Sequence, residues 1–258
     1  LRPMSRAQVL TRQPARHKVG LLSVLDPQRG EPMSVEFASA AMLRVLIQGL
    51  RELNLPPLEN HIYGAHSSSA IVDLDLKLAV VQHALKHGGV ECLIHLGGGV
   101  HQHANEPTHR AMVSAKGPAD LVVRWQRLER YIHSRHRLRI AAQGEGWMEL
   151  THDGVKEGIF PTLHESLVVF GVLAALLEAR GVQGLTIHTG ELSVFPAASR
   201  KAMASLVTVD PIRKWRLTWG KSVMPCASAS LFGHAEDLYA GSDWPEWLRR
   251  LVNHILQH

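Results

Sequence analysis

The stretch from Pro118 to Ile140, P-A-D-L-V-V-R-W-Q-R-L-E-R-Y-I-H-S-R-H-R-L-R-I, predicts a buried helix that runs directly into a β-strand. Pro118 suits a first helical turn, where its missing N–H costs nothing, and the helix dipole favours Asp120 nearby. Apolar residues recur at helical spacing on one face: Leu121, Trp125, Leu128 and Ile132. From Leu138 the apolar residues alternate, which is typical of a strand.

The other face of this helix, expected over 118–136, is predicted to be polar. It carries Arg124, Arg127, Glu129 and Arg130. Asp120 and Arg124 stand four residues apart in the order that stabilises a helix. His133 and His136 are expected in the last turn, where the dipole favours positive charge.

The helical part of the domain is expected over 34–136 and ends with this helix. One helix is predicted from an N-cap at Ser34 to Leu53 and another over 73–87, closed by Gly88 and Gly89. The range 97–107 is interpreted as a polar loop, with its glycine run as a flexible turn. Residues 1–18 carry basic residues and no acid, and are expected to form a flexible basic arm.

The segment after the helix predicts a small antiparallel sheet over 137–219. Strands at 138–142 and 147–152 flank a glycine-containing turn, and further strands are expected at 185–188 and 214–219. Between the two pairs, Thr162 and Glu165 form a capping box at the start of a helix. The fold class is therefore predicted as α+β, with a β-β-α-β-β sheet backed by helices, in one domain over 19–258 that ends in helices at 226–258.

Composition places the chain among ordinary globular proteins and excludes several classes. Hydrophobic residues make up 45% and charged residues 20%, and the net charge of +5 is far from that of a dedicated DNA-binding module. No apolar run is long enough for a membrane span. The two cysteines stand alone, so we expect a reduced, cytoplasmic protein without a disulfide framework.

The sequence contains 17 histidines, which is a high number for this length and raises the possibility of a metal site. His101, His103 and His109 lie near acidic residues and define the alternative hypothesis, a His-rich metal-dependent hydrolase. The sequence has no H-E-x-x-H, and neither cysteine stands at ligand spacing. We therefore predict no metal, no cofactor and no catalytic residue.

Three segments together resemble the effector-binding region of AraC-type transcription regulators, in the subgroup with an α+β sensor domain. They are R-W-Q-R-L-E-R-Y-I-H-S-R-H-R-L at 124–138, E-L-T-H at 149–152 and P-T-L-H-E-S-L-V-V-F-G-V-L-A-A-L-L-E-A-R-G at 161–181. The resemblance implies a bacterial, non-enzymatic ligand sensor that binds a small-molecule effector and forms a homodimer. It also implies that DNA is bound only through a C-terminal helix-turn-helix domain, whose signature is absent from this sequence.

The effector site is predicted where the helical part meets the sheet, because close packing is hardest to complete between two layers. Trp125 is expected to form a wall of the cavity, and Arg124 to bind a carboxylate. His152, at the end of a strand, and Glu165, at the start of a helix, are placed at its mouth.

Overall fold

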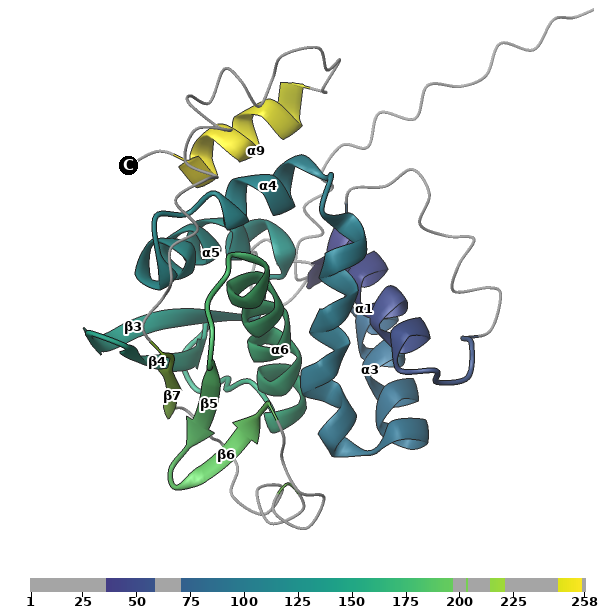
Figure 1. Cartoon of the computed structure of the whole chain (residues 1–258). Helices are drawn as coiled ribbons and strands as arrows, with labels where there is room; N and C mark the ends of the chain where they lie inside the picture. The colour runs from purple at the N-terminus through teal and green to yellow at the C-terminus, as the bar shows by residue number, and fades with distance from the viewer. Residues whose placement is uncertain (1–35, 59–70, 197–202, 204–213, 221–245, 257–258) are drawn as a thin grey trace, which may run out of the picture. The chain divides into compact units, whose positions relative to one another are not determined.

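Two antiparallel sheets and a set of helices form the part of the chain that the computed structural model describes, residues 36–58, 71–196, 203, 214–220 and 246–256 (Figure 1). These residues belong to one unit, Glu36–His258. The predictions for residues 1–18 and for the range 226–245 lie outside the described residues. The mixed content confirms the predicted α+β fold class.

The larger sheet has five strands in the order β3-β4-β7-β5-β6, and every neighbouring pair is antiparallel. The strands are β3 His136–Gly144, β4 Trp147–Gly154, β5 Thr186–Thr189, β6 Leu192–Phe195 and β7 Lys214–Thr218. The predicted β-β-α-β-β order is thus one strand short, because β6 had not been anticipated. Its four residues form a tight hairpin with β5, too short for a clear alternation in the sequence.

Helix α6, Leu163–Ala179, packs beside this sheet and is buried along most of its length (Figure 1). The predicted capping box is present in both directions. The Thr162 hydroxyl accepts from the Glu165 backbone N–H at 3.2 Å, and the Glu165 carboxylate accepts from the Thr162 N–H at 2.9 Å. The box fixes the start of α6, and with it the positions of Glu165 and Ser166.

The glycine run predicted as a flexible turn lies instead inside a 3₁₀ helix, η1, Val90–His103. This helix packs between α1, Ala40–Glu52, and α6. A Cβ on Gly97 would overlap the backbone of Gly171 in α6, and one on Gly99 would overlap the backbone of α1 at Val45. The glycines are therefore required because three backbones approach one another too closely for side chains.

The first helix also begins later than predicted. Phe37–Ser39 form strand β1, which pairs with β2, Ile71–Asp73, and α1 starts only at Ala40. The N-cap is Ser39, whose hydroxyl accepts from the Met42 N–H at 3.0 Å. The predicted N-cap, Ser34, lies outside the described residues. The second helix, α3 Leu74–Gly88, agrees with the prediction to within one residue at each end.

The central helix α5, Pro118–Ile132, is four residues shorter than predicted. His133 is its C-cap and takes an extended conformation, because its backbone bridges to Ala38 of β1. His136 is consequently the first residue of β3 and not part of the helix. Two further helices pack against this region, α4 Pro107–Val113 and α9 Glu246–Leu256, and Arg127 of α5 donates to the Ile255 carbonyl at 3.1 Å.

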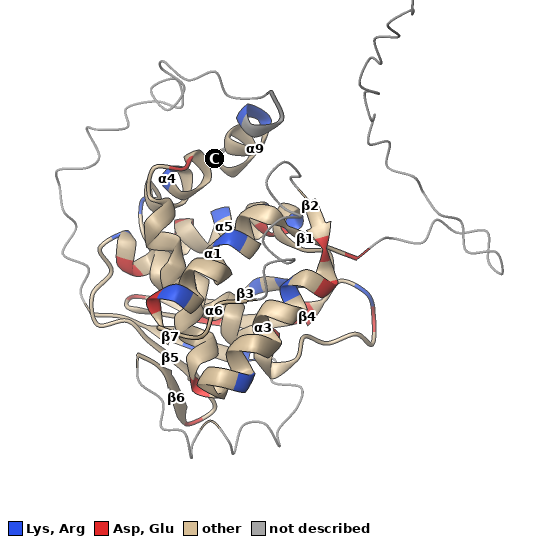
Figure 2. Cartoon of the chain, turned by 90° about the vertical axis from the view of Figure 1, so that its right-hand side faces the viewer, with Lys and Arg blue, Asp and Glu red and all other residues tan. Residues whose placement is uncertain are grey.

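Charged residues of both signs are spread over the described elements. Lys and Arg positions are interspersed with Asp and Glu (Figure 2). Among the described residues, no helix combines the length and the apolar character needed to cross a bilayer.

Candidate functional site

Titratable side chains gather in the interior where α5, β3, β4, α6 and α3 meet. We call this set the polar cluster; its members are Lys77, Glu129, His133, His136, His152, Glu165 and Ser166, each no more than 3% exposed. Charged groups are rarely buried to this degree because desolvation is expensive. The cluster therefore marks the part of the described fold where chemistry other than packing is concentrated.

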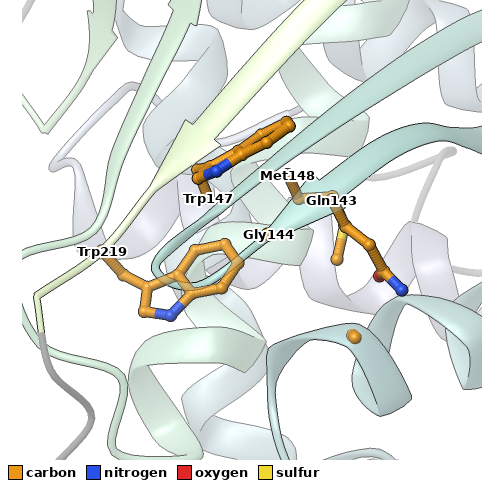
Figure 3. Close-up of a pocket in the computed structure, with 6 residues that line it drawn as sticks. Gln143, Gly144, Trp147, Met148 and Trp219 are labelled. Carbon is orange, nitrogen blue, oxygen red and sulfur yellow. The ribbon is translucent and has the colours of Figure 1, made fainter.

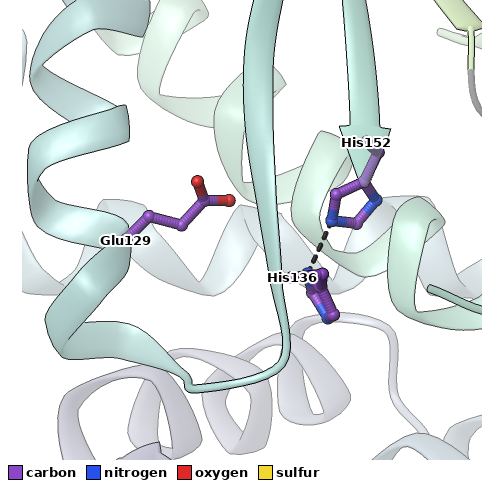
Figure 4. Close-up of side chains that lie close together, drawn as sticks. All are labelled: Glu129, His136 and His152. Atoms are coloured by element: carbon purple, nitrogen blue, oxygen red, sulfur yellow. Dashed lines mark hydrogen bonds between the residues drawn. The ribbon is translucent and has the colours of Figure 1, made fainter. Parts of the chain in front are cut away.

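The local structure explains how these residues meet. Glu129 lies one turn before the end of α5. The chain becomes extended at His133, just after the helix, and then enters β3. In the β3–β4 register Leu138 pairs with His152, while His136 lies two residues before Leu138. Because side chains alternate along a strand, His136, Leu138 and His152 share the inner face of the hairpin. Figure 4 shows the two imidazoles on adjacent strands and the Glu129 carboxylate pointing toward them from α5.

A chain of hydrogen bonds fixes the histidine tautomers. Ser166 donates its single hydroxyl hydrogen to the Thr162 carbonyl at 3.0 Å, so it accepts from His152 Nδ1–H at 2.9 Å. His152 Nε2 then carries the lone pair and accepts from His136 Nδ1–H at 2.6 Å. On the other side of its ring, His136 Nε2 lies 3.7 Å from Glu165 Oε1.

The Glu129 carboxylate is fully buried and accepts two hydrogen bonds. Trp125 Nε1 donates to one oxygen at 3.2 Å and the Leu138 backbone N–H donates to the other at 2.9 Å. Burial nevertheless raises the pKa of Glu129 to about 8, because a carboxylate without solvent is costly to ionise. The predicted solvent-facing position of Glu129 is wrong: it lies four residues after Trp125, on the same face of α5.

Glu165 and Lys77 represent opposite outcomes of burial. Burial alone would raise the pKa of Glu165, but His136, the Thr162 backbone N–H and Arg135, whose Nη1 lies 3.3 Å away, hold the pKa well below its usual range. Lys77 is as deeply buried, and desolvation lowers its pKa although Glu165 and Glu129 favour its charged form. Glu165 is thus stabilised as an anion, whereas burial disfavours the charged form of Lys77.

Burial also favours the neutral form of all three histidines. It lowers the pKa of His136 to about 4, and lowers those of His133 and His152 well below the usual histidine value. Neutral imidazoles are donors to metals and partners in proton transfer. His133 differs from the other two histidines because neither of its ring nitrogens has a hydrogen-bond partner in the described part of the chain.

Such an arrangement suits metal binding or proton transfer along the histidine pair. Across the described residues, Glu129, His136 and His152 form the one group of three potential ligands, and their ligand atoms all lie within 4.8 Å of one another. Within the polar cluster, the one hydroxyl that bonds to a histidine, that of Ser166, is buried and donates to a backbone carbonyl, so it is not arranged as a nucleophile.

A second feature is a surface pocket of about 350 Å³ at the turn of the β3–β4 hairpin. We call it the indole pocket; it is lined by Ala119, Gln143, Gly144, Trp147, Met148 and Trp219. Figure 3 shows the Trp147 and Trp219 indoles on two sides of it and the Gln143 amide at a third. The Trp147 ring lies 4.8 Å from the Arg216 guanidinium, which steadies it from β7. The indole pocket shares no residue with the polar cluster.

The four residues predicted to bind an effector lie in the interior and not in the indole pocket. Trp125, His152 and Glu165 all belong to the polar cluster or contact it. Arg124 points elsewhere: it donates to the Ala111 carbonyl at 2.6 Å and to Ser114 at 2.9 Å, and it pairs with Asp120 at 3.1 Å. It ties α5 to α4, and effector binding by these four residues stays a prediction.

The histidines of the alternative hypothesis are not brought together as a ligand group in the described structure. His103 Nδ1 bonds to Glu106 Oε1 at 2.8 Å. His109 lies buried in α4, with neither ring nitrogen bonded within the described residues.

Sequence reasoning missed Lys77, Glu129 and Ser166 in the cluster, and Trp147 and Trp219 in the pocket. It had assigned His133 and His136 only to the end of the helix. Comparison of the chain with protein-family models, with curated proteins and with solved structures gives no match. The polar cluster, the indole pocket and the three segments noted in the sequence are therefore what indicates a function.

Proposed function

We propose that this chain is the ligand-sensing domain of an AraC-type transcription regulator, and that its effector binds in the indole pocket. The observation that carries this proposal is the pairing of two partly exposed indoles around a pocket of about 350 Å³. That volume is at the lower end of the range for small-molecule sites. The resemblance of the segments at 124–138, 149–152 and 161–181 to AraC-type sensors supports a regulatory role and a homodimer.

The lining of the pocket indicates the class of effector. Indole faces stack on flat rings, and the Gln143 amide offers both a donor and an acceptor to a polar substituent. The first turn of α5 borders the pocket at Ala119. No side chain caps this turn, because its N-cap residue is Gly117. We therefore propose a small planar or cyclic metabolite that carries an anionic or hydrogen-bonding group.

This placement replaces the interior site expected from the sequence as the preferred location. Arg124 is already occupied by Asp120 and two acceptors of the α4 end, and Trp125 donates to Glu129. A ligand there would have to break these buried bonds, whereas the indole pocket requires no such loss.

The test is a thermal-shift screen of aromatic carboxylates and cyclic metabolites, followed by calorimetry. We expect a ligand whose binding is weakened at least about tenfold by Trp147→Ala or Trp219→Ala, as the loss of a stacking aromatic predicts. Tyr131→Ala is the matched control, because this aromatic is 46% exposed and contacts His254 instead. A ligand that binds both pocket variants as tightly as the wild type would contradict this location.

The regulatory role has its own test. Fused to a heterologous DNA-binding domain, the chain should make a reporter gene respond to that ligand, and the response should be lost in the Trp219→Ala fusion. A ligand that is chemically converted by the purified chain would instead indicate an enzyme.

A further inference from the structure

Three cluster residues present metal-ligating atoms to one another inside the fold. His136 Nδ1 and His152 Nε2 lie 2.6 Å apart, and a Glu129 oxygen completes a group whose ligand atoms are all within 4.8 Å. We propose that Glu129, His136 and His152 bind a divalent first-row transition-metal ion such as zinc. This departs from the sequence-based expectation of no metal, and it depends on neither the indole pocket nor its effector.

The ligand set suits this class of ion. Imidazole nitrogen and carboxylate oxygen bind zinc at about 2.0–2.2 Å, so ligand atoms around a tetrahedral ion stand about 3.4 Å apart. The two histidine nitrogens must separate by about 0.8 Å from their hydrogen-bonding distance, and the Glu129 carboxylate must move inward. Side-chain rotations of this size leave the strands and α5 in place.

The residues around the ligands already have the arrangement of an outer shell. A metal-bound histidine usually donates its other ring N–H to a carboxylate, carbonyl or similar acceptor, which orients the ring. His152 donates Nδ1–H to Ser166, leaving Nε2 for an ion. His136 has the Glu165 carboxylate 3.7 Å from Nε2, so that Nδ1 is released for the ion when the proton moves to Nε2.

His133 provides an independent indication of a missing partner. It is 1% exposed, and neither ring nitrogen has a hydrogen bond within the described residues, which is costly for a buried imidazole. Its ring centroid lies 4.1 Å from that of His136, and its Nε2 lies 3.7 Å from Glu129 Oε1. His133 therefore borders the proposed site, in contact with two of its three ligands.

Lys77 sets a condition on this site. Both Glu129 and Glu165 favour its charged form, so a charge on Lys77 would compete with an added cation for these two carboxyl groups. Metal binding should accordingly be tighter when Lys77 is uncharged. The Lys77→Met variant keeps a long apolar stem in the core and removes that charge, which makes it a test that strengthens the site instead of destroying it.

The experiment uses the full chain, freed of metal and titrated with cobalt(II) and zinc(II). We expect one equivalent of cobalt with visible absorption bands of a low-symmetry site, displaced by zinc. His152→Gln and Glu129→Gln should each weaken binding at least about tenfold, and Lys77→Met should tighten it about tenfold. The matched control is the double variant His101→Gln/His103→Gln, which should bind as the wild type does.

A measurement on the wild-type protein covers variants that fail to fold. In nitrogen-detected histidine NMR, zinc should shift the ring resonances of His136 and His152 and leave those of His83 and His87 unchanged. Substoichiometric binding, binding lost only in the His101/His103 double variant, or shifts confined to other histidines would each overturn the proposal.

Discussion

The packing of glycine against backbone between η1 and α6 leads to a prediction that can be made quantitative. In Gly171→Ala, the new Cβ would lie 2.7 Å from the Ile94 carbonyl carbon, whereas carbon atoms in contact normally stand about 3.5–4.0 Å apart. The two helices must therefore separate by about 0.8 Å or more, and the obstacle is backbone that cannot rotate away.

The expected cost follows from that overlap. Overpacking a core typically costs about 1–3 kcal/mol, and replacing a helical glycine returns about 0.5–1 kcal/mol through chain entropy. Because the whole η1–α6 interface must open, the upper part of the range applies. We expect Gly171→Ala to lower the free energy of unfolding by about 2 kcal/mol net.

The glycine run provides a matched control for this measurement. A Cβ on Gly98 would meet only the end of the Glu52 side chain, at 3.1 Å, and that side chain can move. Gly98→Ala should therefore be neutral or slightly stabilising. Urea unfolding followed by circular dichroism measures both variants, and equal stabilities for the two would refute the account of η1 as a tightly packed helix.

Three other perturbations test features outside this interface. Arg124→Met should destabilise the fold by about 2 kcal/mol in urea unfolding, because it leaves Asp120 and the α4 acceptors without their buried donor; a loss below about 0.5 kcal/mol would contradict this. Thr162→Ala should cost about 1 kcal/mol by removing the capping box of α6, while Thr162→Ser should preserve most of it. Burial lowers the pKa of His109 in the folded protein. Below about pH 6.5, the unfolded chain therefore binds a proton at this residue that the folded chain does not bind. The free energy of unfolding then falls by about 1.4 kcal/mol per pH unit as the pH is lowered. His109→Met should make the pH dependence of stability shallower by that amount between pH 6.5 and the lowered pKa, and an unchanged slope would show that His109 is not a buried neutral group.

The elements with strong periodic patterns could be predicted, since their patterns follow directly from burial. The hairpin, α3 and α6 with its capping box all appear within about two residues of their expected bounds. The helix η1 could not, because its glycines are set by contacts with α1 and α6, which are distant in sequence. Without knowledge of these tertiary contacts, the low helix propensity of glycine predicts a turn for such a run.

The polar cluster was missed because charge was given more weight than position. Glu129 continues the spacing of Leu121 and Trp125, and Lys77 falls on the inner face of α3, so periodicity alone places both inside. His136 and His152 likewise occupy inward positions of their strands. A charged residue at an apolar position of a helix or strand is the sequence signal of a buried polar site.

The position of β7 in the sheet has a consequence for how the protein is made. This strand comes last among the described strands but lies between β4 and β5, so the two hairpins β3–β4 and β5–β6 remain separate until residues 214–218 have been synthesised. Until then β4 and β5 each expose an unpaired edge, which is a template for association with other chains. Closure of the sheet pairs Trp147 with Thr218, across 71 positions of sequence, and such long-range pairing is slow. A newly made chain should thus depend most on chaperones after its hairpins have formed and before this strand has inserted.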